Sequence, residues 1–238
     1  MIKKRRYKPI YKKLVRLRKN VNYNNKILTN FNRKKWKPLL TFLFRQSLRR
    51  KYRFRIFDQF NNFISRFFKF RNKKYLFNLL SKQRFNYFYG GIRRNTVKSI
   101  IILSKKLSKK QKLPLNRVFI SLLENRLDTI LYRAHFVKSI REARLLIKHK
   151  HVFINSNIVI TNKHIVRPGD SITISETYKK YVIQNLKEST LWPIPPNYLY
   201  INFKLLNIVL LNNLYSNKFL SHFPFWLDIN SVIHYYKY

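Results

Sequence analysis

Hydrophobic residues recur at helical spacing in several separate stretches of the chain. Between residues 48 and 74 the apolar positions, mostly phenylalanines, are interleaved with arginine and lysine and predict an amphipathic helix. At this spacing phenylalanines fill a core more often than they stack on bases. A further helix is predicted for residues 96–107, and it runs into the basic stretch 105–112.

The clearest helical pattern begins at Asn116, a suitable N-cap, and continues to about Phe136. A second helix is predicted to begin at Ser139, because Glu142 three residues later completes a capping-box pattern. Cations lie beside the apolar faces of these two helices: Arg126, Arg133, Arg141, Arg144 and Lys148.

After residue 150 the hydrophobic period changes from 3.6 to 2, which predicts short strands at 152–154, 158–160 and 172–174. Val166 is expected to form a further strand position, and Pro168-Gly169-Asp170 a turn. The fold class is therefore α+β, with two basic helices packed on a small sheet.

We divide the chain into four parts. Residues 1–37 are a basic N-terminal arm, and residues 38–115 a mainly helical domain that contains the turn 88–91 and ends near a proline. Residues 116–176 form the helix-and-strand domain. Residues 177–238 are a linker and a C-terminal tail, which we expect to pack on the helical domain and complete it.

The charge of the chain points to a polyanionic partner. Its 238 residues include 52 Lys and Arg against 8 Asp and Glu, a formal net charge of +44, although 45% hydrophobic content suffices for a core. Uncompensated like charge opposes compaction, so nucleic acid is the expected partner. The arm would then order on RNA, the alternative being a solvated basic tail.

Several other classes of function are disfavoured by the sequence. Because cysteine is absent and histidines are scattered, we expect no metal and no cofactor. The longest apolar stretch, 198–211, is interrupted by polar residues and too short to span a membrane. The acids form no paired catalytic constellation, so we expect neither an enzyme nor a small-molecule substrate.

The segment Leu122-Leu123-Glu124-Asn125-Arg126-Leu127-Asp128-Thr129-Ile130-Leu131-Tyr132-Arg133 resembles the opening of the RNA-binding domain named after ribosomal protein S-four. Further matching pieces follow in that family's order: Glu142-Ala143-Arg144, Leu146-Ile147, His149, His151-Val152, Asn155 and Val166-Arg167-Pro168-Gly169-Asp170. The combined pattern is much more specific than any single piece.

The flanking residues favour the ribosomal protein itself over other carriers of that domain. Lys34-Lys35-Trp36 looks like the start of mitochondrial members, Phe88-Tyr89-Gly90 resembles the family's aromatic turn, and residues 227–236 are similar to its C-terminal tail. Three departures are Lys150 in place of glycine, Ile140 in place of arginine, and Asn155-Ser156 in place of Asn-Gly. The changes at Lys150 and at Asn155-Ser156 should distort or widen their turns, and Arg141 is the candidate to replace the arginine that is missing at position 140.

The resemblance implies a structural constituent of the mitochondrial ribosome that binds small-subunit ribosomal RNA and supports assembly and translation. Implied protein neighbours include S-three and S-five, near the side where messenger RNA enters, and messenger RNA is a further candidate partner. The implied location is the mitochondrial matrix. Abundant Asn, Lys, Ile, Phe and Tyr have AT-rich codons, which favours encoding in an organelle genome, and the N-terminus carries no recognisable import or secretory signal.

Candidate RNA-binding residues are Arg126, Arg133, Arg141, Arg144 and Lys148, with Arg167 as an outlying contributor. Their side chains would contact phosphates on folded RNA. The alternative is that Arg126 pairs with a carboxylate and the others are solvated, although eight acids are too few to pair with so many cations. Asp128 and Asp170 are assigned to structure.

Competing functions remain open from the residues alone. An RNA-modifying enzyme or an RNA chaperone could carry the same domain, and a DNA-compacting or membrane-surface protein could share the charge. The ordered change from helices to strands disfavours the last two.

Overall fold

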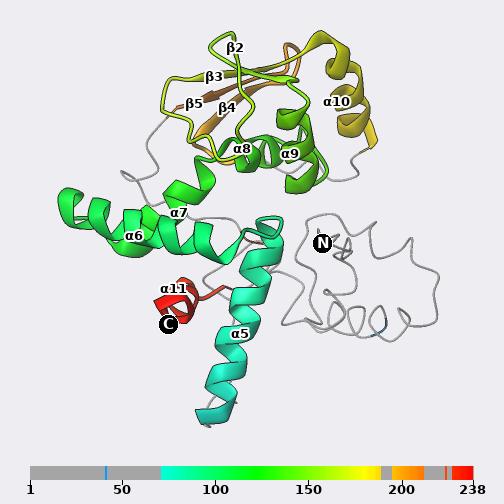
Figure 1. Ribbon diagram of the computed structural model, residues 1–238. Coiled ribbons are helices and arrows are strands. Elements are labelled where there is room, and N and C mark those ends of the chain that lie inside the picture. The colour runs from blue at the N-terminus through cyan, green and yellow to red at the C-terminus, as the bar shows by residue number, and fades with distance from the viewer. Residues whose placement is uncertain (1–40, 42–70, 189–194, 212–222, 224–226, 238) are drawn as a thin grey trace, which may run out of the picture. The chain divides into compact units, whose positions relative to one another are not determined.

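The computed structural model describes residue 41 and residues 71–188, 195–211, 223 and 227–237 (Figure 1). The chain divides into two compact units, one comprising Met1–Ile92 with His222–Tyr238 and the other Arg93–Ser221. The predicted basic arm and most of the helix predicted for residues 48–74 lie outside the described residues.

The first unit is built from helices distant in sequence. Helix α5 (Arg71–Phe88) packs against α11 (Ile229–Lys237), which buries Val232, Ile233 and Tyr236. At the end of α5, Phe88 meets the ring of Phe223 at 5.1 Å. Positive φ angles of 67° and 79° at Gly90 and Gly91 turn the chain, as the aromatic-glycine motif predicted.

The second unit begins with four helices: α6 (Arg94–Gln111), α7 (Leu115–Glu124), α8 (Leu127–Arg133) and α9 (Ile140–Lys148). The single helix predicted from Asn116 to Phe136 is wrong in two respects. Its N-cap is Pro114, and the helix is interrupted between α7 and α8.

The interruption has a tertiary cause. The Asn125 carbonyl accepts a hydrogen bond from the Val166 N–H at 2.9 Å, and the Leu127 N–H donates to the His164 carbonyl at 3.0 Å. A loop from much later in the chain therefore takes backbone groups that a continuous helix would have used.

The predicted start of α9 is confirmed. Ser139 is the N-cap, and its Oγ accepts a hydrogen bond from the Glu142 N–H at 3.2 Å. The Glu142 carboxylate reaches one residue further back than in a standard capping box, because it accepts from the Lys138 N–H at 2.8 Å.

The sheet contains more of the chain than the sequence predicted. Its antiparallel strands, in the order β2-β1-β3-β5-β4, are β1 (Val152–Ile154), β2 (Asn157–Ile158), β3 (Ser171–Ile174), β4 (Leu199–Asn202) and β5 (Asn207–Leu210). Strand β2 is shorter than predicted, and Val166 is buried without belonging to a strand. The α+β class is confirmed.

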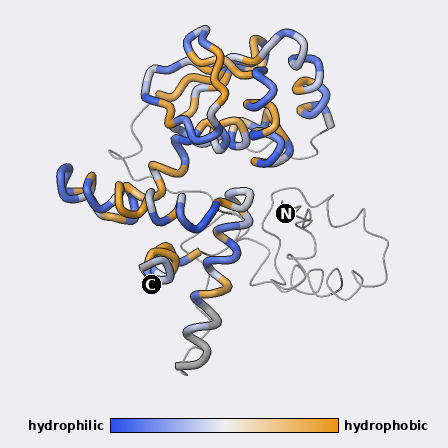
Figure 2. Tube along the Cα trace, viewed as in Figure 1, coloured by the Kyte–Doolittle hydropathy of each residue, from blue (hydrophilic) through white to orange (hydrophobic). Residues whose placement is uncertain are grey.

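One face of the sheet supplies the core. The alternating residues Val152, Ile154, Ile172, Ile174, Ile208 and Leu210 are buried. Helix α8 packs against α9, and the hydropathy colouring shows hydrophobic residues in both these helices and the strands (Figure 2). Helix α10 (Glu176–Glu188) follows β3.

The hairpin between β1 and β2 is tight, which corrects the expectation of a distorted or wider turn. Ile154 pairs with Asn157, so Asn155 and Ser156 form a two-residue loop with φ angles of 47° and 69°. Both residues adopt the conformation that usually requires Asn-Gly. Lys150, standing where the family has glycine, likewise has a φ of 62°.

The domain limits predicted at residues 37, 115 and 176 stay a prediction. What the structure shows is that β4 and β5 extend the sheet beyond residue 176, and that α6 belongs to the same compact unit as the sheet.

Candidate nucleic-acid interface

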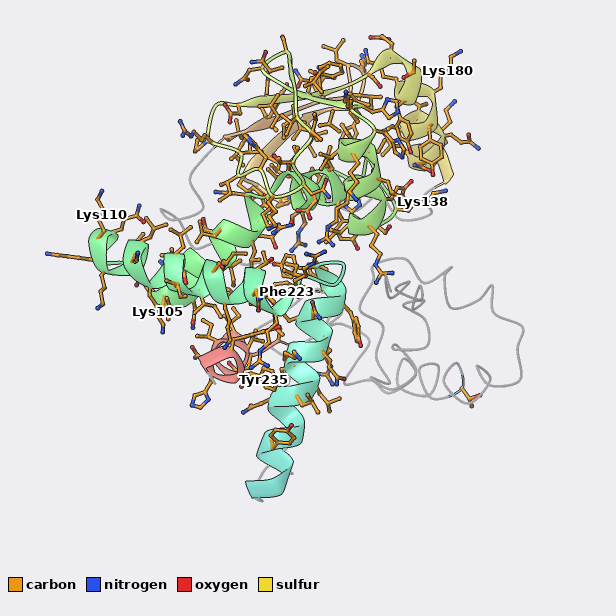
Figure 3. All side chains as sticks on the ribbon, in the orientation of Figure 1. Lys105, Lys110, Lys138, Lys180, Phe223 and Tyr235 are labelled. Atoms are coloured by element: carbon orange, nitrogen blue, oxygen red, sulfur yellow. The ribbon has the colours of Figure 1, made fainter. Side chains whose placement is uncertain are left out.

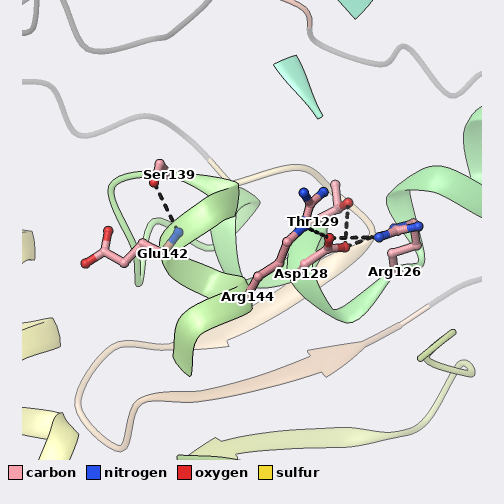
Figure 4. A network of polar contacts seen from close by, with 6 residues as sticks. All are labelled: Arg126, Asp128, Thr129, Ser139, Glu142 and Arg144. Carbon is pink, nitrogen blue, oxygen red and sulfur yellow. Dashed lines mark hydrogen bonds and ion pairs between the residues drawn. The ribbon is translucent and has the colours of Figure 1, made fainter. Parts of the chain in front are cut away.

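Two of the predicted RNA-binding arginines converge on one buried carboxylate (Figure 4). Arg126 is bidentate to Asp128, with Nε at 3.0 Å from Oδ1 and Nη2 at 2.9 Å from Oδ2. Arg144 approaches from α9, and its Nε lies 2.8 Å from Oδ2. The Asp128 side chain is 0% exposed, against 7% for Arg126 and 21% for Arg144. This triad ties α9 to the start of α8.

A second buried pair lies at the other end of α8. The Arg133 guanidinium donates from Nε to Glu124 Oε2 at 2.8 Å and from Nη2 to Oε1 at 2.7 Å. The Tyr198 hydroxyl, next to β4, also donates to Glu124 Oε2 at 3.0 Å. Bidentate, charge-assisted bonds of this kind fix a guanidinium in one orientation.

The expectation that acids are too few to pair with these arginines is therefore corrected. The chain places Glu124 and Asp128 where Arg126 and Arg133 must be buried, because an unpaired charge in the interior would be very costly. Both arginines are only 5% exposed. Their contact with RNA stays a prediction, and it has to be reconciled with this burial.

The other candidate residues are more accessible. Arg141 is half-buried in the first turn of α9, whereas Lys148 is exposed in its last turn. Arg167 is exposed in the loop before β3. Two further cations near α9 are exposed and join the candidate RNA-binding residues: Lys138, just before the helix, and Lys150, just after it. Neither is among the residues predicted from the sequence. Their closeness to α9 in the chain was the available signal.

The loop that carries Arg167 is held by Asp170. The Arg167 N–H donates to Asp170 Oδ2 at 2.8 Å, and Asn155 Nδ2 donates to Oδ1 at 2.9 Å. Gly169 has a φ of +90°, which an L side chain rarely adopts. The turn role assigned to Asp170 is confirmed.

Aromatic contacts fasten α10 to the region beside α9. His151 stacks on Tyr178 with ring centroids 5.4 Å apart, and its Nδ1 lies 3.0 Å from Ser175 Oγ. The Tyr181 hydroxyl donates to Glu142 Oε1 at 2.8 Å. Burial, and next the charge of Glu142, raises the pKa of Tyr178 to about 12. We assign His151, Tyr178 and Tyr181 to the packing of α10 beside α9.

The described residues offer neither a metal site nor a membrane-spanning helix. Within the described ranges, no group of three or more His, Cys, Asp or Glu is arranged to hold a metal ion. Among the helices that the structure describes, none is both long and apolar enough to cross a bilayer.

Comparisons with known proteins agree with this geometry. A family model for the S4 domain, the RNA-binding domain that the sequence resembles, matches residues 125–172, from the break before α8 into β3. The chain is 35% identical to small ribosomal subunit protein uS4m of Reclinomonas americana over 68% of this chain and 66% of that protein. It is 32% identical to uS4c of Phaseolus vulgaris over 70% of this chain and 79% of that protein.

A shorter match joins the chain to a bacterial protein. It is 36% identical to uS4 of Karelsulcia muelleri over 45% of this chain and 52% of that protein. The fold and the matched segment define the class of the molecule as an S4-domain protein. The chain belongs to the family of small ribosomal subunit protein uS4. Its alignments span from about half to about four fifths of these relatives' own lengths.

Proposed function

We propose that this protein is a non-enzymatic structural component of the small ribosomal subunit and that it binds small-subunit ribosomal RNA. The observation that carries the proposal is the rigid cationic layer of α8 and α9, where the arginines are locked by Asp128 and Glu124. This layer lies within the S4-domain match. Arg144 is held by Asp128 and is still 21% exposed, so it is a preorganised cation that loses little entropy when it meets a phosphate.

The six candidate residues have two roles in this proposal. Arg141, Arg144, Lys148 and Arg167 are at least partly exposed, so they contact phosphates directly. Arg126 and Arg133 act mainly from the interior, by holding α8 and α9 in the geometry that presents those cations. Recognition would follow the shape of folded RNA more than its base sequence.

The family relationship supports a more specific proposal about the ribosome, the compartment and the neighbours of this protein. Relatives include a mitochondrial-type protein, uS4m of Reclinomonas americana, which favours the mitochondrial ribosome. We propose the mitochondrial matrix as its location, an organelle genome as its source, and S-three, S-five and messenger RNA as its neighbours. Sedimentation of a gentle mitochondrial lysate tests this setting. Stoichiometric travel with the small subunit supports it, and recovery only in RNA-free fractions contradicts it.

The phosphate-binding residues can be tested by salt titration. The full-length chain and its Arg141→Gln/Lys148→Gln/Arg167→Gln variant are compared for binding to a small-subunit ribosomal RNA transcript. We expect the slope of log affinity against log salt to fall by about 0.7 to 0.9 for each cation that no longer neutralises a phosphate. The matched control replaces the exposed Lys163, Lys187 and Lys204 with glutamine, and should change the slope much less.

Two results would reject the proposal. An unchanged slope in the triple variant would show that the assigned residues do not bind phosphate. Equal affinity of the wild-type chain for random duplex DNA and for the transcript would instead indicate a generic basic protein.

A further inference from the structure

The strands of the sheet carry no charged side chain, although 25% of the whole chain is charged. Within the five described strands there is neither lysine, arginine, aspartate nor glutamate. The charged residues of the second unit lie on helices and loops instead. The labelled side chains of Lys105, Lys110, Lys138 and Lys180 extend from α6, from the loop before α9 and from α10 (Figure 3). The sheet is therefore a neutral region in a strongly cationic protein.

The side of the sheet opposite the core carries side chains that the strand register joins together. Successive residues of a strand point to opposite faces, so the residues between the buried ones lie on this second side. Strand pairing places them in two rows: Phe153 with Ile158 and Thr173, and Val209 with Ser171 and Tyr200. We call these residues the outer sheet face.

The outer sheet face is accessible at both edges of the sheet. Ile158 on the edge strand β2 is 54% exposed, and Tyr200 on the opposite edge strand β4 is 58% exposed. Phe153 and Val209 between them are partly exposed. Single exposed apolar residues are ordinary, but a sheet face that meets water usually carries polar residues, and edge strands are usually protected by charges, especially lysine. The lack of charge favours a face that another molecule covers.

The chemistry of the outer sheet face favours a protein as the covering molecule. Aromatic side chains on a sheet can stack on bases, but surfaces that bind single strands combine them with cations, which this face lacks. A second copy of this chain would bring another formal charge of +44 against the first. The centres of protein–protein interfaces, by contrast, are poor in charge and rich in aromatic residues.

The width and the surroundings of the face define the partner further. Tyr200 and Ile158 lie on the two edge strands of the five-stranded sheet, about 19 Å apart at about 4.8 Å for each strand step. One interface of about 800 Å² on each protein spans that distance. Lys204 is exposed in the turn that joins β4 to β5. A complementary partner surface therefore has an apolar centre with acidic residues around it.

We propose that the outer sheet face is the docking surface for a neighbouring protein of the small ribosomal subunit. The partner covers the face with an apolar patch rimmed by aspartate or glutamate, and Tyr200 and Ile158 are its anchor residues on this chain. The inference rests on the proposed function, because the partner is held in the same ribosomal particle. It assigns to the sheet a role that does not involve RNA.

Site-specific photo-cross-linking tests the docking surface in the assembled particle. Three full-length chains carry the photoreactive residue benzoylphenylalanine in place of Tyr200, of Ile158 or, as the control, of Ile102 on α6, which is 57% exposed. Each is assembled into small ribosomal subunits of the source organism, and the purified particles are irradiated. Mass spectrometry after nuclease digestion identifies the cross-linked peptide.

We expect positions 158 and 200 to cross-link to one and the same protein, at peptides with apolar residues close to aspartate or glutamate. The control at position 102 should not cross-link to that protein. Cross-links from positions 158 and 200 to ribosomal RNA, to lipid or to this chain itself would each overturn the inference, because the face would then have a different occupant. The absence of any cross-link at both positions would show a face that meets only solvent.

Substitutions test whether the same residues hold the partner. Tyr200→Arg/Ile158→Arg should lower the amount of the cross-linked protein that is retained in purified small subunits by at least about tenfold, because interface anchors typically contribute more than that factor. The matched control Ile102→Arg/Leu103→Arg, at residues 57% and 41% exposed on α6, should change the retention less than about twofold. Equal losses in both variants would contradict the assignment of the anchors.

Milder substitutions keep the test decisive if the arginine variant does not fold, which circular dichroism checks. Tyr200→Thr/Ile158→Thr preserves strand propensity and should still lower the retention by about fivefold, whereas Tyr200→Phe should keep it. The threonine variant should bind a small-subunit ribosomal RNA transcript with the wild-type salt slope, because no cation is removed. A lower slope would instead assign the face to RNA. If the wild-type chain itself does not enter small subunits, the proposed function fails first, which differs from a chain that enters them without cross-linking.

Discussion

Two basic regions of one compact unit use their cations in opposite ways. In α8 and α9, Arg126, Arg133 and Arg144 are held by the buried carboxylates Asp128 and Glu124. In α6 the lysines are exposed and their segment contains no acid. The difference teaches that Asp128 and Glu124 lie where arginines are buried and need a counter-charge, whereas the segment that carries the exposed lysines has no acid.

The largest expected effect comes from removing a buried carboxylate. Asp128→Asn leaves the two guanidinium groups of Arg126 and Arg144 without their counter-charge, which should lower the free energy of unfolding by about 3 to 5 kcal/mol. Urea denaturation followed by circular dichroism measures it. Glu176→Gln is the control, because Glu176 pairs with Lys179 at the surface. It should cost less than about 1 kcal/mol. Equal effects would refute the contrast between buried and exposed charge.

The next largest effect is a loss of stability at low pH, which His135 after α8 should cause and α6 should not. Burial, followed by the charge of Arg133, lowers the pKa of His135 from 6.5 to about 4. The unfolded chain therefore binds the proton more readily than the folded one. The histidine's contribution is complete above about pH 6.5 and is lost progressively as the pH falls toward 4.

At pH 5 this proton linkage should reduce the free energy of unfolding by roughly 2 kcal/mol relative to pH 7. His135→Asn removes the titrating group and suits the positive φ of 61° at that position. Urea unfolding of both proteins at the two pH values measures the difference, which should shrink in the variant. An identical pH dependence in both would exclude His135 as the cause. Segment 93–123 holds no histidine or acid, so its charge should not change in this window.

The smallest effects concern two residues with positive φ, one in the β1–β2 turn and one at the end of α6. Ser156 has a φ of 69° in the β1–β2 turn, and Lys112 has a φ of 53° after α6. Glycine at either position should raise the free energy of unfolding by about 1 kcal/mol, because it adopts this conformation without the steric cost. Thermal and urea unfolding would test both variants, and a decrease in stability would contradict the strain argument.

The Lys112→Gly and Ser156→Gly variants also separate an effect on stability from an effect on RNA binding. Lys112→Gly also removes an exposed cation at the end of α6, so the salt slope for RNA binding should fall by up to about 1. Ser156→Gly leaves the charge unchanged and should leave the slope unchanged. If both variants bound with the wild-type slope, Lys112 would not neutralise a phosphate.

Much of the S4 domain could be predicted from local sequence. The cap Ser139, the helix α9, the first and third strands and the turn at Asp170 depend on periodicity and on side-chain bonds between near neighbours. The cationic residues of the candidate site were also visible. Chain order could not reveal which would be buried, because the partners Glu124 and Arg133 lie nine residues apart on different helices.

The sequence by itself determined the fold class, the basic character of the surface and the family of this protein, because these follow from composition, short-range periodicity and a linear motif. Only the tertiary structure decided that a loop at His164 and Val166 interrupts the long helix, and that β4 and β5 join the sheet. It also decided which arginines are locked inside. Each of these depends on hydrogen bonds or ion pairs between residues brought together by folding, and local propensity carries no information about such partners.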